Sequence, residues 1–181
     1  MKSFDAVIIG GGIVGTACAY RLSQAGLSVA LIEKRFISAG VTSAGMGHIL
    51  VMDDSEAQVA LTSRSREIWR ELSGDLPDIC EFENCGTLWV ASNEDELEEA
   101  VKKESFYRKK GIHAKVVDSE ELRRLEPALS EELAGGLRVE DDCVVYQPAA
   151  ARFFASEAKR MGAVLIENDC GEKLVDSSLT L

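Results

Sequence analysis

The sequence lacks several features that would assign it to a particular class of protein. It shows no internal repeat and no low-complexity linker, and no apolar run approaches the roughly 20 residues of a membrane span. The apolar run at residues 6–9 is too short for the core of a signal peptide, and Asp5 precedes it. We therefore expect a cytoplasmic protein without a membrane span.

Positive charge, histidine and paired cysteines are also scarce. The chain has 20 Lys and Arg against 31 Asp and Glu, a net charge of −11, which argues against nucleic acid or an anionic membrane as a partner. Its five cysteines form no C-x-x-C pair, and it has two histidines. We therefore expect reduced, buried thiols and no metal site.

A glycine-rich turn near the start of the chain is the strongest positive feature. It lies within "FDAVIIGGGIVGTACAYRLSQAGLSVALIEK", residues 4–34. Phe4–Ile9 is typical of a strand buried on both faces, and residues 27–32 form a second apolar run. Between them, residues 13–25 show helical spacing, and Gly26 suits the position after a helix end. The side of this helix that we expect to be apolar contains Val14, Ala17, Cys18, Arg21 and Leu22.

The glycines fit the G-x-G-x-x-G pattern of a dinucleotide-binding turn. Gly10 would permit the tight turn, Gly12 would let the backbone approach a pyrophosphate, and Gly15 would let the helix pack closely on the strand. The phosphates would meet the free N–H groups at the start of the helix, around Gly12, Ile13 and Val14.

Two later features support a nucleotide site over an ordinary glycine turn. Glu33 lies 23 residues after Gly10, at the end of the second strand, where a carboxylate can accept hydrogen bonds from both ribose hydroxyls. The loop "SAGVTSAGMG", residues 38–47, is uncharged, and eight of its ten residues are Gly, Ala, Ser or Thr. Small side chains leave backbone N–H groups open to a large flat ligand, whereas a flexible surface loop usually carries charged residues.

The rest of the chain alternates helices and strands. Helices are expected at 53–73, 93–110, 119–125 and 148–161, and strands at 87–92, 113–117 and 163–167. Two short strands would flank Asp141 and Asp142, which we interpret as turn residues rather than paired catalytic carboxylates. The last residues, "KLVDSSLTL", are typical of a hairpin or of a strand pair that has only begun.

Several segments together resemble the FAD-dependent D-amino-acid oxidase superfamily, which includes glycine and sarcosine oxidases, D-amino-acid dehydrogenases and D-hydroxyproline dehydrogenase subunits. They are the glycine turn with Ala19 four residues after Gly15, "TSAGMGH", "CGTLWVASNEDEL", "LRRLEPAL" and "VVYQPAAARFFASEAKRMGA". The resemblance covers nearly the whole chain.

The resemblance implies an α/β fold, a Rossmann-like FAD-binding βαβ unit with part of an α+β substrate domain. Residues 1–80 would be the FAD-binding segment, 81–147 a partial substrate domain, and 148–181 the return to an incomplete FAD-binding domain. Family members are about twice as long, so we expect the N-terminal half of an enzyme, inactive alone. The later FAD segments and the arginine that binds the substrate carboxylate would lie outside these 181 residues.

The resemblance also implies residues that hold FAD, while it leaves the catalytic residues unknown. The pyrophosphate would meet Gly10, Gly12, Ile13, Val14 and Gly15, and the ribose would meet Glu33, with Lys34 beside it. The ribityl chain, toward the flavin ring, would meet Thr42, Ser43, Ala44, Gly45 and Met46. His48 would follow, as either a substrate-facing or a structural residue. The chain departs from the family in lacking the Arg-Asn pair before Ala-Gly and in placing Gly171 near the adenine contact.

The implied reaction is oxidation of a C–N bond of an amino acid or secondary amine by hydride transfer to flavin N5. The partners would be that small molecule and, in a hetero- or homo-oligomer, other subunits. Two alternatives stay open: an NAD-dependent enzyme domain, which would not need the uncharged loop, and a non-catalytic nucleotide-binding subunit completed by another chain.

Overall fold

The computed structural model describes residues 3–51, 55–170, 173–175 and 178–180. The chain divides into two compact units. The first unit consists of Met1–Gly47, Leu72–Phe82 and Val145–Leu181, and the second of His48–Glu71 and Glu83–Val144. The predicted division into FAD-binding and substrate segments concerns the roles of these parts, and it stays a prediction.

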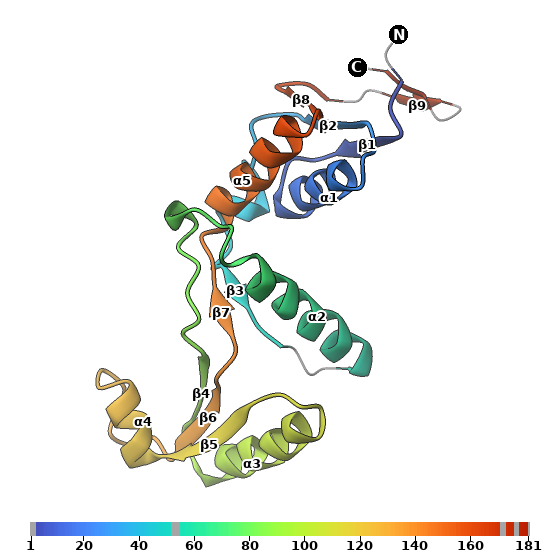
Figure 1. Ribbon diagram of the computed structural model, residues 1–181. Coiled ribbons are helices and arrows are strands. Elements are labelled where there is room, and N and C mark those ends of the chain that lie inside the picture. The colour runs from blue at the N-terminus through green and yellow to red at the C-terminus, as the bar shows by residue number, and fades with distance from the viewer. Residues whose placement is uncertain (1–2, 52–54, 171–172, 176–177, 181) are drawn as a thin grey trace. The chain divides into compact units, whose positions relative to one another are not determined.

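The first unit is built on a parallel sheet, as the sequence predicts (Figure 1). Its principal elements are β1 (Ala6–Ile9), α1 (Ile13–Gln24), β2 (Val29–Glu33), α5 (Gln147–Arg160) and β8 (Val164–Glu167). The strand order is β1-β2-β8, and both pairs are parallel. The helix between β1 and β2 completes the predicted βαβ unit, and Gly26 ends it with a φ of +81°.

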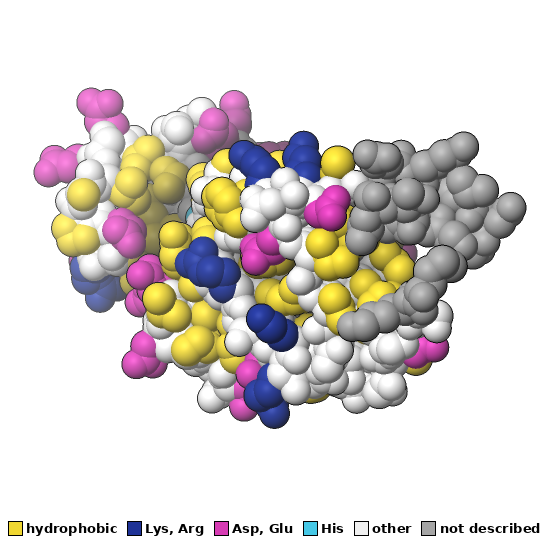
Figure 2. All heavy atoms as spheres, turned by 90° about the horizontal axis from the view of Figure 1, so that it is seen from above, with side chains coloured by type: hydrophobic (Ala, Val, Ile, Leu, Met, Phe, Trp, Pro, Cys, Tyr) yellow, Lys and Arg dark blue, Asp and Glu magenta, His cyan; other side chains and the backbone are white. Residues whose placement is uncertain are grey.

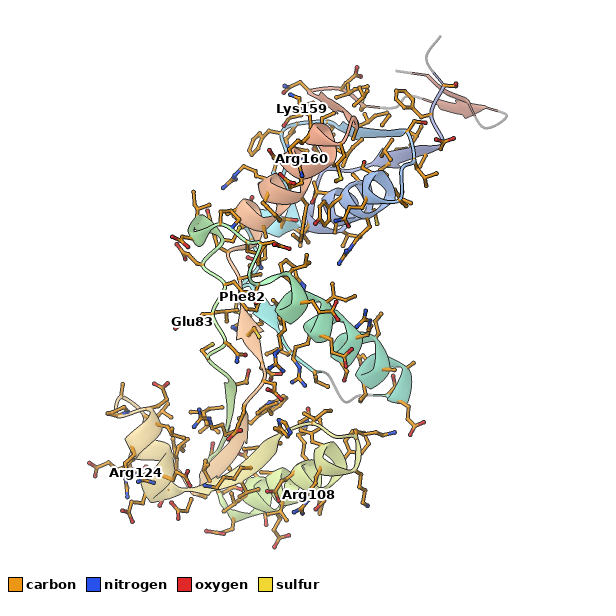
Figure 3. The ribbon with its side chains drawn as sticks, viewed as in Figure 1. Phe82, Glu83, Arg108, Arg124, Lys159 and Arg160 are labelled. Atoms are coloured by element: carbon orange, nitrogen blue, oxygen red, sulfur yellow. The ribbon has the colours of Figure 1, made fainter. Side chains whose placement is uncertain are left out.

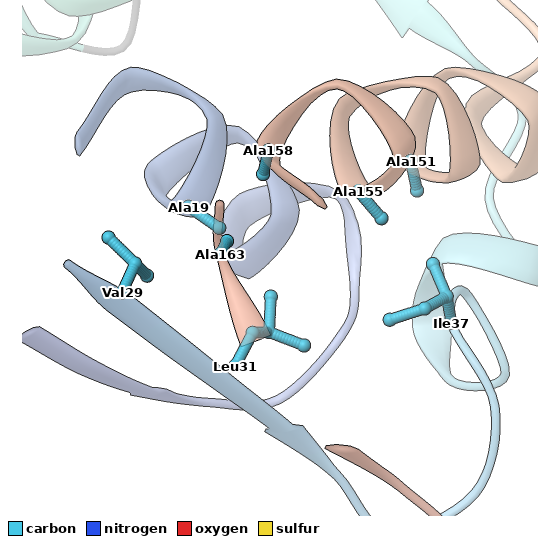
Figure 4. Packing of buried hydrophobic residues seen from close by; sticks show 8 residues of the cluster. All are labelled: Ala19, Val29, Leu31, Ile37, Ala151, Ala155, Ala158 and Ala163. Atoms are coloured by element: carbon cyan, nitrogen blue, oxygen red, sulfur yellow. The ribbon is translucent and has the colours of Figure 1, made fainter. Parts of the chain in front are cut away.

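The two helices of this unit pack against each other through small side chains. Figure 4 shows Ala158 of α5 close to Ala19 of α1, with Ala155 and Ala151 farther along α5 toward Ile37; all belong to one cluster with Leu31 of β2. Alanine side chains allow close approach of the two helices, and all of these residues are buried. Nearby, the rings of Tyr20 and Phe154 stack with their centroids 5.4 Å apart.

The predicted apolar side of α1 is wrong. The buried residues are Thr16, Ala19, Tyr20 and Ser23, whereas Val14 is 74% exposed. The spacing predicted the helix correctly, and Leu22 of the predicted side does pack against the core cluster, but the buried positions are a mixture of small, polar and aromatic residues. Because the neighbouring helix is rich in alanine, close packing rather than side-chain hydrophobicity selects this face.

The first strand also differs from the prediction that it is buried on both faces. Its residues alternate between half-buried and exposed, and Val7 and Ile9 are 47% and 68% exposed. In a strand, successive side chains point to opposite faces. By contrast, β2 lies in the middle of the sheet, and its residues Val29–Ile32 are all buried.

The remaining elements of the first unit are short. They are the 3₁₀ turns η1 (Val41–Ser43) and η2 (Asp78–Cys80), and the strands β9 (Lys173–Val175) and β10 (Ser178–Thr180). The last two strands pair antiparallel, which confirms the hairpin predicted there. The helix α5 begins with Pro148 in its first turn and ends with Lys159 and Arg160, which suit the negative end of the helix dipole (Figure 3).

The second unit is an antiparallel sheet with helices. Its elements are β3 (His48–Ile49), α2 (Glu56–Leu72), β4 (Thr87–Ala91), α3 (Glu94–Lys109), β5 (Ala114–Asp118), α4 (Ser119–Leu125), β6 (Gly135–Val139) and β7 (Cys143–Val144). The strand order is β4-β6-β5, and β3 pairs with β7. Apart from β3, where no strand was predicted, these elements agree with the predicted ranges within a few residues. Asp53 and Asp54, expected at the start of α2, lie outside the described residues.

The surface is mixed in character. Figure 2 shows hydrophobic side chains exposed between acidic and basic ones on one face. Within the part of the chain that the structure describes, no helix is both long and apolar enough to cross a membrane.

Candidate cofactor site

The glycine turn joins β1 to α1 in a conformation that needs glycine. Gly10 has a φ of +104°, and its N–H donates to the carbonyl of Ile32 at 2.8 Å. A β-carbon at Gly15 would lie 1.9 Å from the Gly10 carbonyl oxygen, so no other residue fits without a shift of the backbone. The close packing predicted for Gly15 is therefore explained by its contact with Gly10 itself.

Gly12 is the residue that opens the start of α1. It precedes the helix without a side-chain cap, and a β-carbon there would lie 3.0 Å from Thr42 Oγ1. Among the described residues, the N–H groups of Gly12 and Val14 have no hydrogen-bond acceptor. Free N–H groups at a helix start fit the phosphates of a dinucleotide, whereas the Ile13 N–H between them already donates to the Thr42 hydroxyl.

The middle glycine, Gly11, has a role that sequence reasoning missed. A β-carbon there would lie 2.6 Å from Ile37 Cδ1 and 3.0 Å from Glu33 Cβ. Its N–H donates to Glu33 Oε2 at 2.7 Å, and its carbonyl accepts the Ser38 N–H at 2.8 Å. The three consecutive glycines were the only signal for this contact in the sequence.

Glu33 stands at the end of β2, beside the glycine turn. Its carboxylate accepts two backbone hydrogen bonds. One comes from the Gly11 N–H, and the other comes from the Arg35 N–H, at 2.9 Å from Oε1. The hydrogen bond from Gly11 is the main cause that holds the pKa of Glu33 below its ordinary value, with smaller contributions from Arg35 and Lys34. A carboxylate has about four acceptor positions, so Glu33 can accept further donors while it stays ionised at neutral pH.

The loop at residues 38–47 returns to the same turn. The Thr42 hydroxyl accepts the Ile13 N–H at 3.0 Å, and Thr42 is buried. The turn η1 ends at Ser43, whose Oγ donates to the carbonyl of Ser38. The structure thus brings Thr42 to the start of α1, next to Gly12.

The predicted contact residues are not all in one place. Lys34 is exposed after β2, and the predicted contact residues Ser43, Ala44, Gly45 and Met46 of the loop are exposed as well. Met46 is 82% exposed. His48 is exposed on β3 in the second unit. The structure therefore brings the turn, Glu33 and Thr42 together, while the assignment of each residue to a part of FAD stays a prediction.

A family model described as FAD dependent oxidoreductase (DAO) matches residues 5–176. The chain belongs to this family. The resemblance seen in the sequence is thereby confirmed, and so is FAD as the cofactor of the family. The cradle of Gly12, the free N–H groups and Glu33 fit such a dinucleotide.

Individual members of the family show how far the similarity reaches. A glycine oxidase of Bacillus licheniformis is 28% identical over 173 residues, which are 92% of this chain and 46% of that protein. Anaerobic glycerol-3-phosphate dehydrogenase subunit A1 of Haloferax volcanii is 32% identical over 149 residues, 79% of this chain and 24% of that protein.

A crystal structure of glycine oxidase from Bacillus cereus shares the fold, with a TM-score of 0.88 and 28% identity. The similarity covers 96% of this chain and 48% of that one. The chain thus spans about half the length of the glycine oxidases that it matches.

Proposed function

We propose that this chain is part of an FAD-dependent enzyme that oxidises the C–N bond of an amino acid or secondary amine. Two observations together support the proposal. The chain belongs to a family of FAD-dependent oxidoreductases, and in the turn Gly12 leaves the start of α1 open beside Glu33. The similarity to glycine oxidases supports the substrate class.

The chain's own residues would bind and orient the cofactor. The N–H groups at the start of α1 would receive the pyrophosphate, and Glu33, with Lys34 beside it, would accept the ribose hydroxyls. The residues that would contact the pyrophosphate are Gly10, Gly12, Ile13, Val14 and Gly15. When bound, the flavin supplies the hydride acceptor at N5, and the protein supplies binding, orientation and electrostatics.

The loop would follow the cofactor from the ribityl chain to the ring. Its residues in this role are Thr42, Ser43, Ala44, Gly45 and Met46. Four of these five residues are small, and Thr42 links the loop to the start of α1. The division of residues 1–80, 81–147 and 148–181 into FAD-binding and substrate segments belongs to the same proposal.

Two alternatives are separated from this proposal by the same experiment. An NAD-dependent domain is disfavoured by the family, whose members use FAD. A non-catalytic subunit completed by another chain would bind FAD without oxidising any amine. One of the relatives is a glycerol-3-phosphate dehydrogenase subunit. Glycerol 3-phosphate, which would be oxidised at a C–O bond rather than a C–N bond, must therefore be compared with the amines.

The test uses the whole protein to which the chain belongs. We expect it to purify yellow, with an FAD spectrum, and to lose that colour anaerobically with glycine, sarcosine, a D-amino acid or D-hydroxyproline. Bleaching by glycerol 3-phosphate alone would contradict the amine assignment, and FAD without any bleaching would favour the non-catalytic subunit. Binding of NAD instead of FAD would overturn the proposal.

A further inference from the structure

The segment that enters α5 lies against the end of the loop at residues 38–47. The Val145 N–H donates to the carbonyl of Gly47 at 2.9 Å. Gly47 has a φ of +80°, and a β-carbon there would lie 2.1 Å from the Val145 carbonyl oxygen. The loop therefore ends in a backbone contact with a segment that follows it by about a hundred residues in the sequence.

Gln147, the first residue of α5, extends this contact with its side chain. A β-carbon at Gly45 would lie 2.6 Å from Gln147 Nε2, and one at Gly47 would lie 3.4 Å from Gln147 Oε1. The carboxamide thus occupies the space that side chains at positions 45 and 47 would take. Gly45 needs no left-handed backbone, so the proximity of Gln147 is a reason for glycine there.

The same helix also holds the start of the loop. Arg152, five residues after Gln147, donates from Nη1 to Ser38 Oγ at 3.4 Å. Ser38 is buried and has a φ of +72°. With the bond between Thr42 and Ile13, the loop is fixed at its start, middle and end.

We propose that Gln147 is a positioning residue of the cofactor site. Its carboxamide lies against the loop at Gly45 and Gly47. This contact would fix the position of the neighbouring exposed residues, which are the ones proposed to follow the flavin. The inference rests on the proposed function, which assigns the loop to FAD, and adds a residue that belongs to no dinucleotide-binding motif. The contact predicts a specific coupling between Gln147 and Gly45.

A double-mutant cycle measures that coupling. The variants Gly45→Ala, Gln147→Ala and the double variant are made in the whole protein, and the FAD dissociation constant of each apo-protein is measured by fluorescence titration. We expect each single variant to bind FAD about tenfold more weakly. In the Gln147→Ala background, Gly45→Ala should change the constant less than about twofold, because the methyl group no longer meets the carboxamide.

Two matched variants control for substitution itself. Gly74→Ala places a methyl group where no atom lies within 4 Å and no positive φ is required. Gln24→Ala removes a glutamine of the same unit whose amide donates to the Tyr20 hydroxyl at 2.8 Å. Both should keep the wild-type constant and the wild-type visible band of bound flavin, while Gly45→Ala and Gln147→Ala should shift that band.

The outcomes separate the inference from the function on which it rests. If the wild-type protein binds no FAD, the proposed function fails and the inference fails with it. If wild type binds FAD and Gln147→Ala binds it equally well with an unshifted band, only the inference is overturned. Equal costs of Gly45→Ala in both backgrounds would overturn it too. Because Gln147→Ala adds no atoms, its constant remains decisive even if Gly45→Ala does not fold.

Discussion

Glu33 shows how a single carboxylate can be prepared for a ligand. Two backbone N–H groups, from Gly11 and Arg35, fix its orientation, and they also keep it ionised by lowering its pKa. A ribose diol can then bind to the remaining acceptor positions without first displacing a side-chain partner. The contact with Gly11 makes the glycine turn and the acid one unit.

We therefore expect Glu33→Gln in the whole protein to weaken FAD binding about tenfold, because a charged acceptor contributes about 1 kcal/mol more per hydrogen bond than a neutral one. Fluorescence titration of the apo-protein measures the change. Glu157→Gln is the control, since Glu157 pairs with Arg160 at 2.7 Å on the surface of α5. An unchanged constant in Glu33→Gln would place the ribose elsewhere.

Substitutions at two glycines of the turn should have different effects, one on protein stability and one on FAD binding. Gly15→Ala places its methyl group against the Gly10 carbonyl oxygen, so the free energy of unfolding should fall. Gly12→Val meets the hydroxyl of Thr42 and the space expected for the pyrophosphate, so FAD retention should be lost while the far-UV circular dichroism stays largely native. Normal flavin content in Gly12→Val would remove Gly12 from the phosphate site.

At the scale of elements, a buried ion pair joins α2 to the strands of the second unit. Arg66 Nη1 lies 2.9 Å from Asp142 Oδ1, and both residues are buried. The Val51 N–H also donates to this carboxylate, at 3.4 Å. Burial raises the pKa of Asp142, and the hydrogen bond from Arg66 acts in the opposite direction. Asp142 lies in the turn between β6 and β7, as the sequence predicts, and its side chain is also the buried partner of Arg66.

Breaking this pair should destabilise the protein more than removing it. We expect Asp142→Asn to lower the free energy of unfolding by about 3 kcal/mol, because it leaves Arg66 buried without its charge partner. The double variant Arg66→Met, Asp142→Leu should recover most of that loss. Chemical denaturation measures both.

A surface pair on the same helix provides the control for that experiment. Arg64 lies 3.0 Å from Glu67, and both side chains are more than half exposed. Arg64→Gln should therefore change the free energy of unfolding by less than about 1 kcal/mol. Equal effects of Asp142→Asn and Arg64→Gln would show that burial of the Arg66 pair has no energetic consequence.

At the scale of the whole molecule, the part of the chain that the structure describes exposes apolar side chains on β1, an edge strand of its sheet. Val7 and Ile9 of β1 point to a face that α1 and α5 do not cover. An edge strand offers unpaired backbone groups, and with apolar side chains it favours association with other chains.

The 181-residue polypeptide by itself should therefore associate and bind FAD weakly. The helix start and Glu33 supply only a few kcal/mol, while micromolar affinity needs about 8 kcal/mol. Light scattering should show a mass that rises with concentration, and Val7→Thr with Ile9→Thr should reduce it. Leu61→Gln, at a 72% exposed position on α2, is the control. Tight, stoichiometric FAD with amine oxidation by this polypeptide would contradict the prediction.

The sequence is sufficient to predict the βαβ unit, the family and most of the helices and strands, although it does not indicate β3. These features depend on local spacing: glycines at 10, 12 and 15, an acid at 33 and apolar runs between them. The separate segments that resemble the family add specificity, because each lies in a different part of the chain. The roles of the individual site residues are inferred from the same patterns, and titration of the variants tests them.

Three features become visible once the chain is folded: the buried side of α1, the contact that requires glycine at position 11, and the residue that lies against Gly45. Periodicity gives the angle of a side chain around its helix, but the neighbour that buries it comes from a distant part of the chain. The alanines of α5 follow α1 by more than a hundred residues, as Gln147 follows Gly45. Such contacts depend on how the elements pack, and no local pattern records them.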